Sequence, residues 1–576
     1  MKTFIGCCLT ALLLLTGCSN GEHVFVVGDL TYKETKGGCK VAKSDDNYAG
    51  DIIVPAEVEY NGKKYEVVAI DDYAFRDCTD LGSVALPYTV TTIGNGAFMG
   101  CTQLGRVSLS EGLTEIGPSA FERCVRIQNL DLPATVVTIG EAAFENCTTL
   151  ESIQLPNSIT KVDAWTFAFC VSLKDIKFPD NLEEIGERAF ASCKSLSAVY
   201  LPQHLKTIGK MAFQKCSGIT NITIPVEVKE IGAGAFNYCD LQQIHVAIGN
   251  LFYVDDHGVL LTSDRKSLHT FPSKIVGNVV VSKGVEHILD QAFAGTERLW
   301  SLTIPEGVTS IGAGAFADCV STREIKLPSS INTIGEGAFF NCVSLSSVNL
   351  PSSLTSIPAQ CFVNCRTLRD IEMPDNVTEI GNSAFRDCVS LTNVKFPAKL
   401  KNIAASAFAN CFTIRDVTLP EGLEQIGELC FSACSSLFRI ELPSSLVLIG
   451  DACFENCVTL DRIILPSHLT RIGFKTFKGC ASLAEVSLPS RMESIATSAF
   501  EDCSTLLNMR FPQSVKSIAA KAFMNCPSLI DVTMQRPIMI EWNSFDDKYV
   551  ILHVPAGQKA AFEKQENYEH FKFIED

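Results

Sequence analysis

The chain has 576 residues, with a hydrophobic fraction of 46% and a charged fraction of 20%, which is typical of a folded protein and not of a disordered one. Its formal charge is −17, and the acidic residues are spread along the sequence instead of forming a tail. Because nucleic-acid binding requires clustered basic side chains, this distribution argues against a nucleic-acid partner.

Residues 1–17 are predicted to be an export signal. They contain one lysine, an apolar run from Ile5 to Leu15, and a small residue before Cys18. The run is too short to span a bilayer as a mature helix and is typical of a cleaved signal peptide. The order of these features resembles the bacterial lipoprotein signal, so we expect lipid attachment at Cys18 and a short linker over residues 18–23. A plain secretory signal is the alternative.

Residues 24–69 are predicted to form a β-rich N-terminal cap. The segments VFVVGDLTY, DIIVPAEVEY and YEVVAI alternate apolar and polar residues, and the Gly37-Gly38 and Asn61-Gly62 pairs mark turns between strands. These strands should cover the open apolar end of the elements that follow.

A repeat of 23 residues occupies most of the remaining chain. Its clearest marker is a phenylalanine that usually follows alanine or cysteine and in two repeats follows threonine, called here the clock phenylalanine. It recurs at Phe75, Phe98, Phe121, Phe144, Phe167, Phe190, Phe213 and Phe236, and again at Phe293, Phe316, Phe339, Phe362, Phe385, Phe408, Phe431, Phe454, Phe477, Phe500 and Phe523. This spacing places eight repeats in residues 70–239 and eleven in residues 286–535. A period of this length indicates a solenoid.

Within each repeat the pattern is L-x-x-V-x-L-P-x-x-L-x-x-I-G-x-x-A-F-x-x-C. The segment LESIQL at residues 150–155 alternates like a strand, and Pro156 ends its pairing. The Ile139-Gly140 step marks a bend where a Cβ would crowd its neighbours, and the Ala-Phe segment is expected to form a single α or 3₁₀ turn. Neighbouring coils should stack with their strands parallel, about 4.8 Å apart.

This motif resembles the BspA-like leucine-rich repeat, also called the Treponema-type repeat. The resemblance implies an α/β, mostly β, right-handed leucine-rich-repeat solenoid with a parallel concave sheet, short helical turns and a cap at each end. It also implies an exported bacterial protein that acts in adhesion, and it brings no catalytic residues.

Two segments depart from the repeat. Residues 240–285 are an insert within the solenoid that interrupts the period. They are predicted to form a small antiparallel hairpin or meander with turns at His257-Gly258 and Asp264-Arg265, and they resemble the modified coils of this repeat family. Residues 536–576 form the C-terminal cap, with VILHVP as the last strand and AGQKAAFEKQENY as a helix.

Eighteen of the 25 cysteines lie three residues after a clock phenylalanine, and Thr296 takes that place in one repeat. Because the column follows the core period and accepts threonine, we expect buried thiols that act as small apolar side chains. Disulfides between adjacent coils are the main alternative. A metal site or a catalytic thiol is not supported by the cysteine spacing, and no metal or other cofactor is predicted.

Ligand binding is expected at the outward positions of the L-x-x-V-x-L strands. Exposed aromatic and arginine side chains are typical binding anchors. The candidates are Trp300, Tyr200, Phe438, Arg323, Arg439 and Arg462. Elsewhere on these positions the signs of charge alternate, so neighbouring coils should form ion pairs.

The sequence therefore predicts a lipid-anchored envelope protein, not an enzyme, that binds a protein or glycan macromolecule through its solenoid surface. The residues after Cys18 favour the outer membrane or the cell surface, by resemblance to lipoprotein sorting rules. A monomer is expected, with no membrane contact beyond the N-terminal lipid. The alternatives are a structural envelope protein without a soluble ligand and, more weakly, a carbohydrate-binding or carbohydrate-processing protein.

Overall fold

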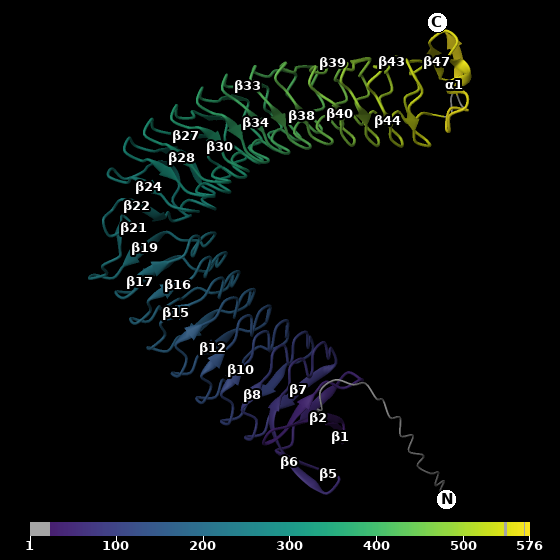
Figure 1. Ribbon diagram of the computed structural model, residues 1–576. Helices are drawn as coiled ribbons and strands as arrows, with labels where there is room; N and C mark the ends of the chain where they lie inside the picture. The colour runs from purple at the N-terminus through teal and green to yellow at the C-terminus, as the bar shows by residue number, and fades with distance from the viewer. Residues whose placement is uncertain (1–22, 547–549, 570) are drawn as a thin grey trace, which may run out of the picture. The chain divides into compact units, whose positions relative to one another are not determined.

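A computed structural model describes residues 23–546, 550–569 and 571–576 (Figure 1). The predicted signal peptide and Cys18 lie outside these residues. The chain forms two compact units, Met1–Asn181 and Leu182–Asp576. Both units are mostly-β solenoids with parallel sheets, and together they contain about 22 turns. No helix within the described residues has the length and apolar character needed to cross a bilayer.

Each regular coil contains two short strands. The first strand carries the L-x-x-V-x-L motif: in β12 (Ser152–Gln154), Ile153 is buried between two exposed residues. The second strand is a two-residue piece before the bend, such as β13 (Lys161–Val162). This alternation places one face of each strand in the core and the other in solvent, as the sequence predicts.

First strands pair in parallel with the first strands of neighbouring coils. In the N-terminal unit they are β7 (Leu81–Ala85), β9 (Arg106–Ser108), β12 and β14 (Asp175–Lys177). In the C-terminal unit they are β17 (Asn221–Ile224), β19 (Gln243–Val246), β23 (Gly277–Val280), β25 (Leu299–Thr303), β27 (Glu324–Lys326), β29 (Ser347–Val348), β31 (Asp370–Glu372), β33 (Asn393–Lys395), β35 (Asp416–Thr418), β37 (Arg439–Glu441), β39 (Arg462–Ile464), β41 (Glu485–Ser487), β43 (Asn508–Phe511) and β45 (Asp531–Met534).

Second strands form a separate set of parallel pairs. In the N-terminal unit they are β8 (Thr92–Ile93), β10 (Glu115–Ile116), β11 (Thr138–Ile139) and β13. In the C-terminal unit they are β15 (Glu184–Ile185), β16 (Thr207–Ile208), β18 (Glu230–Ile231), β24 (His287–Ile288), β26 (Ser310–Ile311), β28 (Thr333–Ile334), β30 (Ser356–Ile357), β32 (Glu379–Ile380), β34 (Asn402–Ile403), β36 (Gln425–Ile426), β38 (Leu448–Ile449), β40 (Arg471–Ile472), β42 (Ser494–Ile495), β44 (Ser517–Ile518) and β46 (Met539–Ile540).

Where a glycine follows a second strand, it lies close to the preceding coil, as predicted. A Cβ on Gly140 would come within 2.5 Å of the Pro118 nitrogen in the preceding coil. The bend therefore requires the missing side chain at this point.

The Ala-Phe segment is not a helical turn, so that prediction was wrong. In the coil of Phe144, both Ala142 and Asn146 adopt left-handed backbone conformations, with φ of 57° and 59°. Alternate N–H groups then donate to the next coil; Phe144 donates to the Thr166 carbonyl at 2.9 Å. Because these donors serve a neighbouring coil, they are not free for the successive intrahelical bonds of a helix.

The clock phenylalanines form buried columns of stacked rings. Centroids of consecutive rings lie 5.1 Å apart at Phe339 and Phe362, with the planes inclined by 4°. Tyr48 extends the column at its N-terminal end, 4.7 Å from Phe75. In the C-terminal unit, Phe545 extends the column of that unit, 5.0 Å from Phe523. These rings are among the largest fully buried side chains of the core.

The N-terminal cap has the predicted hairpins. Its strands are β1 (Val24–Val27), β2 (Leu30–Thr35), β3 (Gly38–Ala42), β4 (Gly50–Ile53), β5 (Glu57–Tyr60) and β6 (Lys63–Ile70). The β2–β3 and β5–β6 pairs are antiparallel, and β6 continues in parallel into β8. The cap thus forms the transition from antiparallel hairpins to the parallel strand pairing of the solenoid.

The interruption after Phe236 contains the predicted meander, formed by β20 (Tyr253–Asp256), β21 (Val259–Thr262) and β22 (Ser267–Thr270). It is also part of the solenoid. The ring of Phe271 stacks 4.6 Å from Phe293, so this segment supplies a modified coil that the 23-residue period does not reveal.

Two buried side chains in the meander replace backbone pairing at β18. The Ile231 N–H donates to the Tyr253 hydroxyl at 3.0 Å, and His269 Nε2 donates to the Ile231 carbonyl at 2.8 Å. Burial lowers the pKa of His269, which keeps the imidazole neutral.

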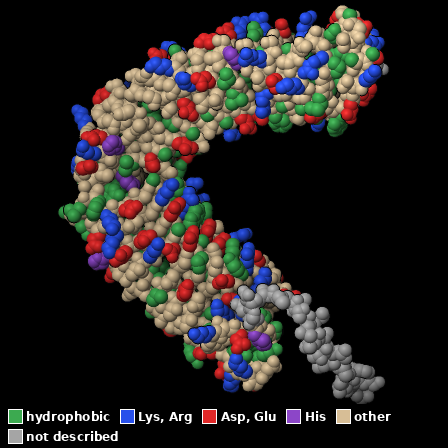
Figure 2. Space-filling model, viewed as in Figure 1, with side chains coloured by type: hydrophobic (Ala, Val, Ile, Leu, Met, Phe, Trp, Pro, Cys, Tyr) green, Lys and Arg blue, Asp and Glu red, His purple; other side chains and the backbone are tan. Residues whose placement is uncertain are grey.

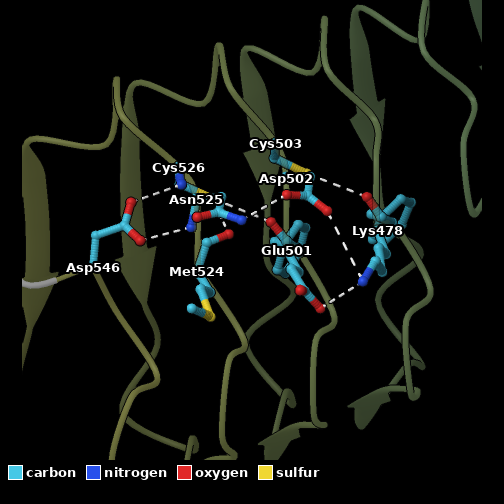
Figure 3. A network of polar contacts seen from close by, with 10 residues as sticks. Lys478, Glu501, Asp502, Cys503, Met524, Asn525, Cys526 and Asp546 are labelled. Atoms are coloured by element: carbon cyan, nitrogen blue, oxygen red, sulfur yellow. Dashed lines mark hydrogen bonds and ion pairs between the residues drawn. The ribbon is translucent and has the colours of Figure 1, made fainter.

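The C-terminal cap differs from its prediction. The helix α1 (Lys559–Phe562) has a single turn, and β47 (Ile551–Val554) is followed by a further parallel strand, β48 (Lys572–Glu575). The carboxylate of Asp546 accepts from the N–H groups of Asn525 at 2.7 Å and Cys526 at 3.0 Å (Figure 3). This carboxylate satisfies backbone donors at the end of the stack, much as an N-cap residue does for a helix.

Candidate binding surface

The candidate site is the solvent-exposed side of the first strands, called here the first-strand face. Each strand presents residues on both sides of one buried position, as in the exposed–buried–exposed pattern of β37 and β39. Adjacent strands are about 4.8 Å apart, so residues at one position form a column across the coils. Acidic and basic side chains are interspersed on the visible surface (Figure 2).

The three predicted aromatic residues are all solvent-exposed. The exposed fraction is 82% for Tyr200, 55% for Trp300 and 37% for Phe438. The structure thus confirms their outward positions and leaves their binding role as a prediction. Tyr200 lies with Gln203, Asn221 and Thr223 along an open groove of about 490 Å³.

Trp300 occupies an irregular point of the first-strand sheet. Leu299 pairs with Gly277 and Ser301 with Asn278, so Trp300 is an extra residue in β25 and forms a β-bulge. Bulges redirect side chains, which accounts for the exposure of this large ring. Arg323 lies in the next coil at the same column, and its N–H donates to the Trp300 carbonyl at 2.9 Å.

Phe438, Arg439 and Arg462 lie together on adjacent strands. Arg439 and Arg462 are paired in register across β37 and β39. Arg415 from the preceding coil places its guanidinium 5.7 Å from the centre of the Phe438 ring, a cation–π contact. The six predicted residues therefore form a Trp300–Arg323 group, a Phe438–Arg439–Arg462 group and an isolated Tyr200.

Elsewhere the predicted charge pairing is present. Lys174 Nζ lies 2.8 Å from a carboxylate oxygen of Glu151, one coil away. Lys395 and Glu372 also form an ion pair between paired strands. Such exposed pairs contribute little stability, about 0–1 kcal/mol each, but they reduce repulsion between stacked columns.

One exposed apolar feature was missed by the sequence reasoning. In the turn that precedes β20, Ile248, Leu251 and Phe252 are exposed, and Asn250 holds the turn in place. Asn250 Nδ2 donates to the carbonyls of Pro225 and Val228 at 2.8 and 3.0 Å. The apolar run AIGNLF could have indicated this feature, because it lies outside the repeat pattern.

The repeated thiols have no arrangement suited to chemistry. Every described cysteine is free and buried, which confirms the expected packing role. Cys147 Sγ donates to the Phe121 carbonyl of the preceding coil at 3.2 Å, and burial raises the pKa of Cys147 to about 12. A protonated thiol is neither a nucleophile nor a metal ligand. In the described part of the chain, no group of three or more His, Cys, Asp or Glu residues could hold a metal ion.

The stacked coils, the parallel sheets and the exposed face of the first strands define a leucine-rich-repeat solenoid. The chain belongs to the BspA-type leucine-rich-repeat family: the family model for a region of six such repeats matches residues 68–196, 137–256, 286–415 and 401–530.

Three solved structures are among those similar to the chain. A leucine-rich cell surface protein from Faecalibacterium prausnitzii is 26% identical, with a TM-score of 0.49 over 71% of this chain and 95% of that one. A leucine-rich repeat protein from Bacteroides ovatus is 22% identical, with a TM-score of 0.38 over 96% and 100%. A third, from Eubacterium ventriosum, is 20% identical, with a TM-score of 0.38 over 76% and 95%. Comparison with curated proteins gives no match.

Proposed function

We propose that the protein is a non-enzymatic, lipid-anchored protein of the bacterial cell envelope, on the outer membrane or cell surface, that binds a protein or glycan through its first-strand face. The observation that carries this proposal is Trp300, a large ring held in solvent by a β-bulge beside Arg323. An exposed aromatic ring lowers solubility and adds no buried apolar area to the core. At protein interfaces, by contrast, aromatic and arginine side chains contribute much of the binding energy.

The test is binding of the protein, expressed from its full sequence, to arrays of extracellular-matrix proteins and glycans. We expect the Trp300→Ala, Tyr200→Ala, Phe438→Ala triple variant to lose at least about tenfold in affinity for the captured ligand, as truncated interface anchors do. Tyr88→Ala is the matched control, because Tyr88 is 75% exposed but lies in the turn that follows β7. Unchanged binding by the triple variant, or binding to no array component, would contradict the proposal.

Anchoring is tested separately. Metabolic labelling with a palmitate analogue should modify the wild-type protein and leave Cys18→Ser unlabelled, since only the thiol accepts the lipid. Protease treatment of intact cells should then degrade the wild-type protein if it faces outward. Labelling of the Cys18→Ser variant would exclude lipid attachment at this residue.

A structural role without a soluble ligand is the second candidate. The ion pairs between coils, such as Lys174–Glu151, favour a structural role because the charged side chains in that part of the face already have partners within the protein. The array experiment distinguishes the two roles, since a purely structural protein would capture no ligand.

A further inference from the structure

Arg439 and Arg462 are an exception in the sheet that carries the first-strand face. They occupy one column on the neighbouring strands β37 and β39 and are paired in register. No other in-register pair described for the first strands carries like charges. The flanking pairs, Asp416 with Arg439 and Arg462 with Glu485, have opposite charges. Like charges directly opposite each other destabilise a sheet, so the pair is unfavourable to folding.

Neither arginine forms a close ion pair within the described residues, although Asp416 and Glu485 lie opposite them on the neighbouring strands. The Asp416 carboxylate lies 3.9 Å from Arg415 Nε. Within the described chain, neither Arg439 nor Arg462 has a carboxylate oxygen within 4.0 Å. Both arginines are exposed, so their guanidinium groups can reach a ligand from solvent. A guanidinium presents several N–H donors in a planar fork, which suits two-point binding of a carboxylate.

Apolar side chains flank the two cations. Ile464 is 74% exposed and follows Arg462 by two residues, which places both on the same face of β39. Phe438 immediately precedes Arg439, beside the guanidinium of Arg415. The patch thus combines unpaired cations with an exposed aliphatic side chain and an exposed aromatic ring.

We infer that Arg439 and Arg462 together bind carboxylate side chains of an acidic polypeptide segment, with Phe438 and Ile464 contacting the apolar side chains of that segment. A carboxylate between the two strands accepts from both guanidinium groups and removes their mutual repulsion. The exposed isoleucine favours a polypeptide over a sulfated glycan, because such a glycan carries no aliphatic side chains for it to contact. This inference rests on the proposed function and names the ligand chemistry of one part of that face.

The experiment measures binding of the full-length protein to an immobilised random copolymer of glutamate and tyrosine. The double variant Arg439→Gln, Arg462→Gln should bind at least about tenfold more weakly, because it loses hydrogen bonds to a charged partner. Arg510→Gln is the matched control, since Arg510 is an exposed arginine of the same face on β43.

Two further measurements make the result decisive. The double variant should unfold at about the same temperature as the wild type, because loss of the like-charge pair is offset by loss of the two flanking opposite-charge pairs. Equal copolymer binding by the wild type and the double variant, or binding of the wild type to heparin alone, would overturn the inference. Either result would leave the proposed function intact if the array ligand still bound and still required Trp300.

Discussion

The hydroxyl of Tyr238 donates a hydrogen bond to the carboxylate of Asp318, 80 residues further along the chain. Each residue lies two positions after a clock phenylalanine and has a left-handed backbone conformation. Between them lies Gly295, where a Cβ would come within 2.5 Å of the Tyr238 ring. The absent side chain lets Tyr238 reach past the coil that contains Gly295, so that this polar column continues beyond the meander.

Tyr238→Phe should therefore lower the free energy of unfolding of the C-terminal unit by about 1.5–3 kcal/mol, the usual loss for a hydrogen bond to a charged acceptor. The measurement is urea unfolding followed by circular dichroism. Tyr200→Phe is the control, and it should stay within about 0.5 kcal/mol of the wild type because that side chain is exposed. A Tyr238→Phe variant as stable as this control would show that the hydrogen bond does not contribute to the free energy of unfolding.

The thiol columns predict loss of stability at alkaline pH. Burial raises the pKa of Cys101, Cys147, Cys434 and Cys526 to about 12 in the folded chain, against 9.0 for an unperturbed thiol. The unfolded chain therefore releases these protons first, and stability falls as pH rises from 9 towards 12. At one unit above the unfolded pKa, each such thiol costs about 1.4 kcal/mol.

Thermal unfolding between pH 7 and pH 10.5 checks this prediction, and the midpoint should fall steeply above pH 9. A thiol-specific reagent at pH 8 should leave the folded protein unlabelled and label it after denaturation. Rapid labelling of the native protein would show that the columns are open to solvent.

His553 predicts a second pH effect, at the C-terminal cap. Here folding stabilises the charged form of a side chain, whereas in the thiol columns it stabilises the neutral form. Its two ring nitrogens lie 3.2 Å from Asp531 and 2.9 Å from Asp576. Hydrogen bonds to Asp531 and Asp576 raise the pKa of His553 above its usual 6.5. The stabilisation is thus complete below pH 6.5 and is lost as pH rises through the folded value. Amide exchange in β47 and β48 should be slower at pH 5.5 than at pH 8, after correction for intrinsic rates. His553→Gln should remove that difference.

Asp546→Ala should expose the backbone donors at the end of the stack. It removes the acceptor of the Asn525 and Cys526 N–H groups, for an expected loss of about 0.5–2 kcal/mol, as for other capping side chains. Amide exchange at these two residues should accelerate more than at Phe385, deep in the column. Asp375→Ala, at an exposed carboxylate, should leave all these rates unchanged.

Much of the fold follows from local patterns. The 23-residue period of Phe144 and its equivalents predicted stacked coils. The alternation around Ile153 predicted the first strands and their exposed positions. Phe271 and Phe545 were not recognised, because their coils have other lengths and lack the Ala-Phe pair. The left-handed residues, such as Ala142 and Asn146, were missed because the hydrogen bonds that favour them come from the neighbouring coil. The predicted capping helix was too long, since only one turn forms in α1.

The candidate site, like the fold, was predicted only in part. That Trp300, Tyr200 and Phe438 are exposed could be read from their places in the repeat, because outward positions recur with the period. The bulge at Trp300, the in-register contact of Arg439 with Arg462, and the absence of a carboxylate beside them could not. Periodicity in one chain fixes which residues face the core or the solvent. Strand register and side-chain pairing depend on coils 23 or more residues apart, so only the tertiary structure decides them.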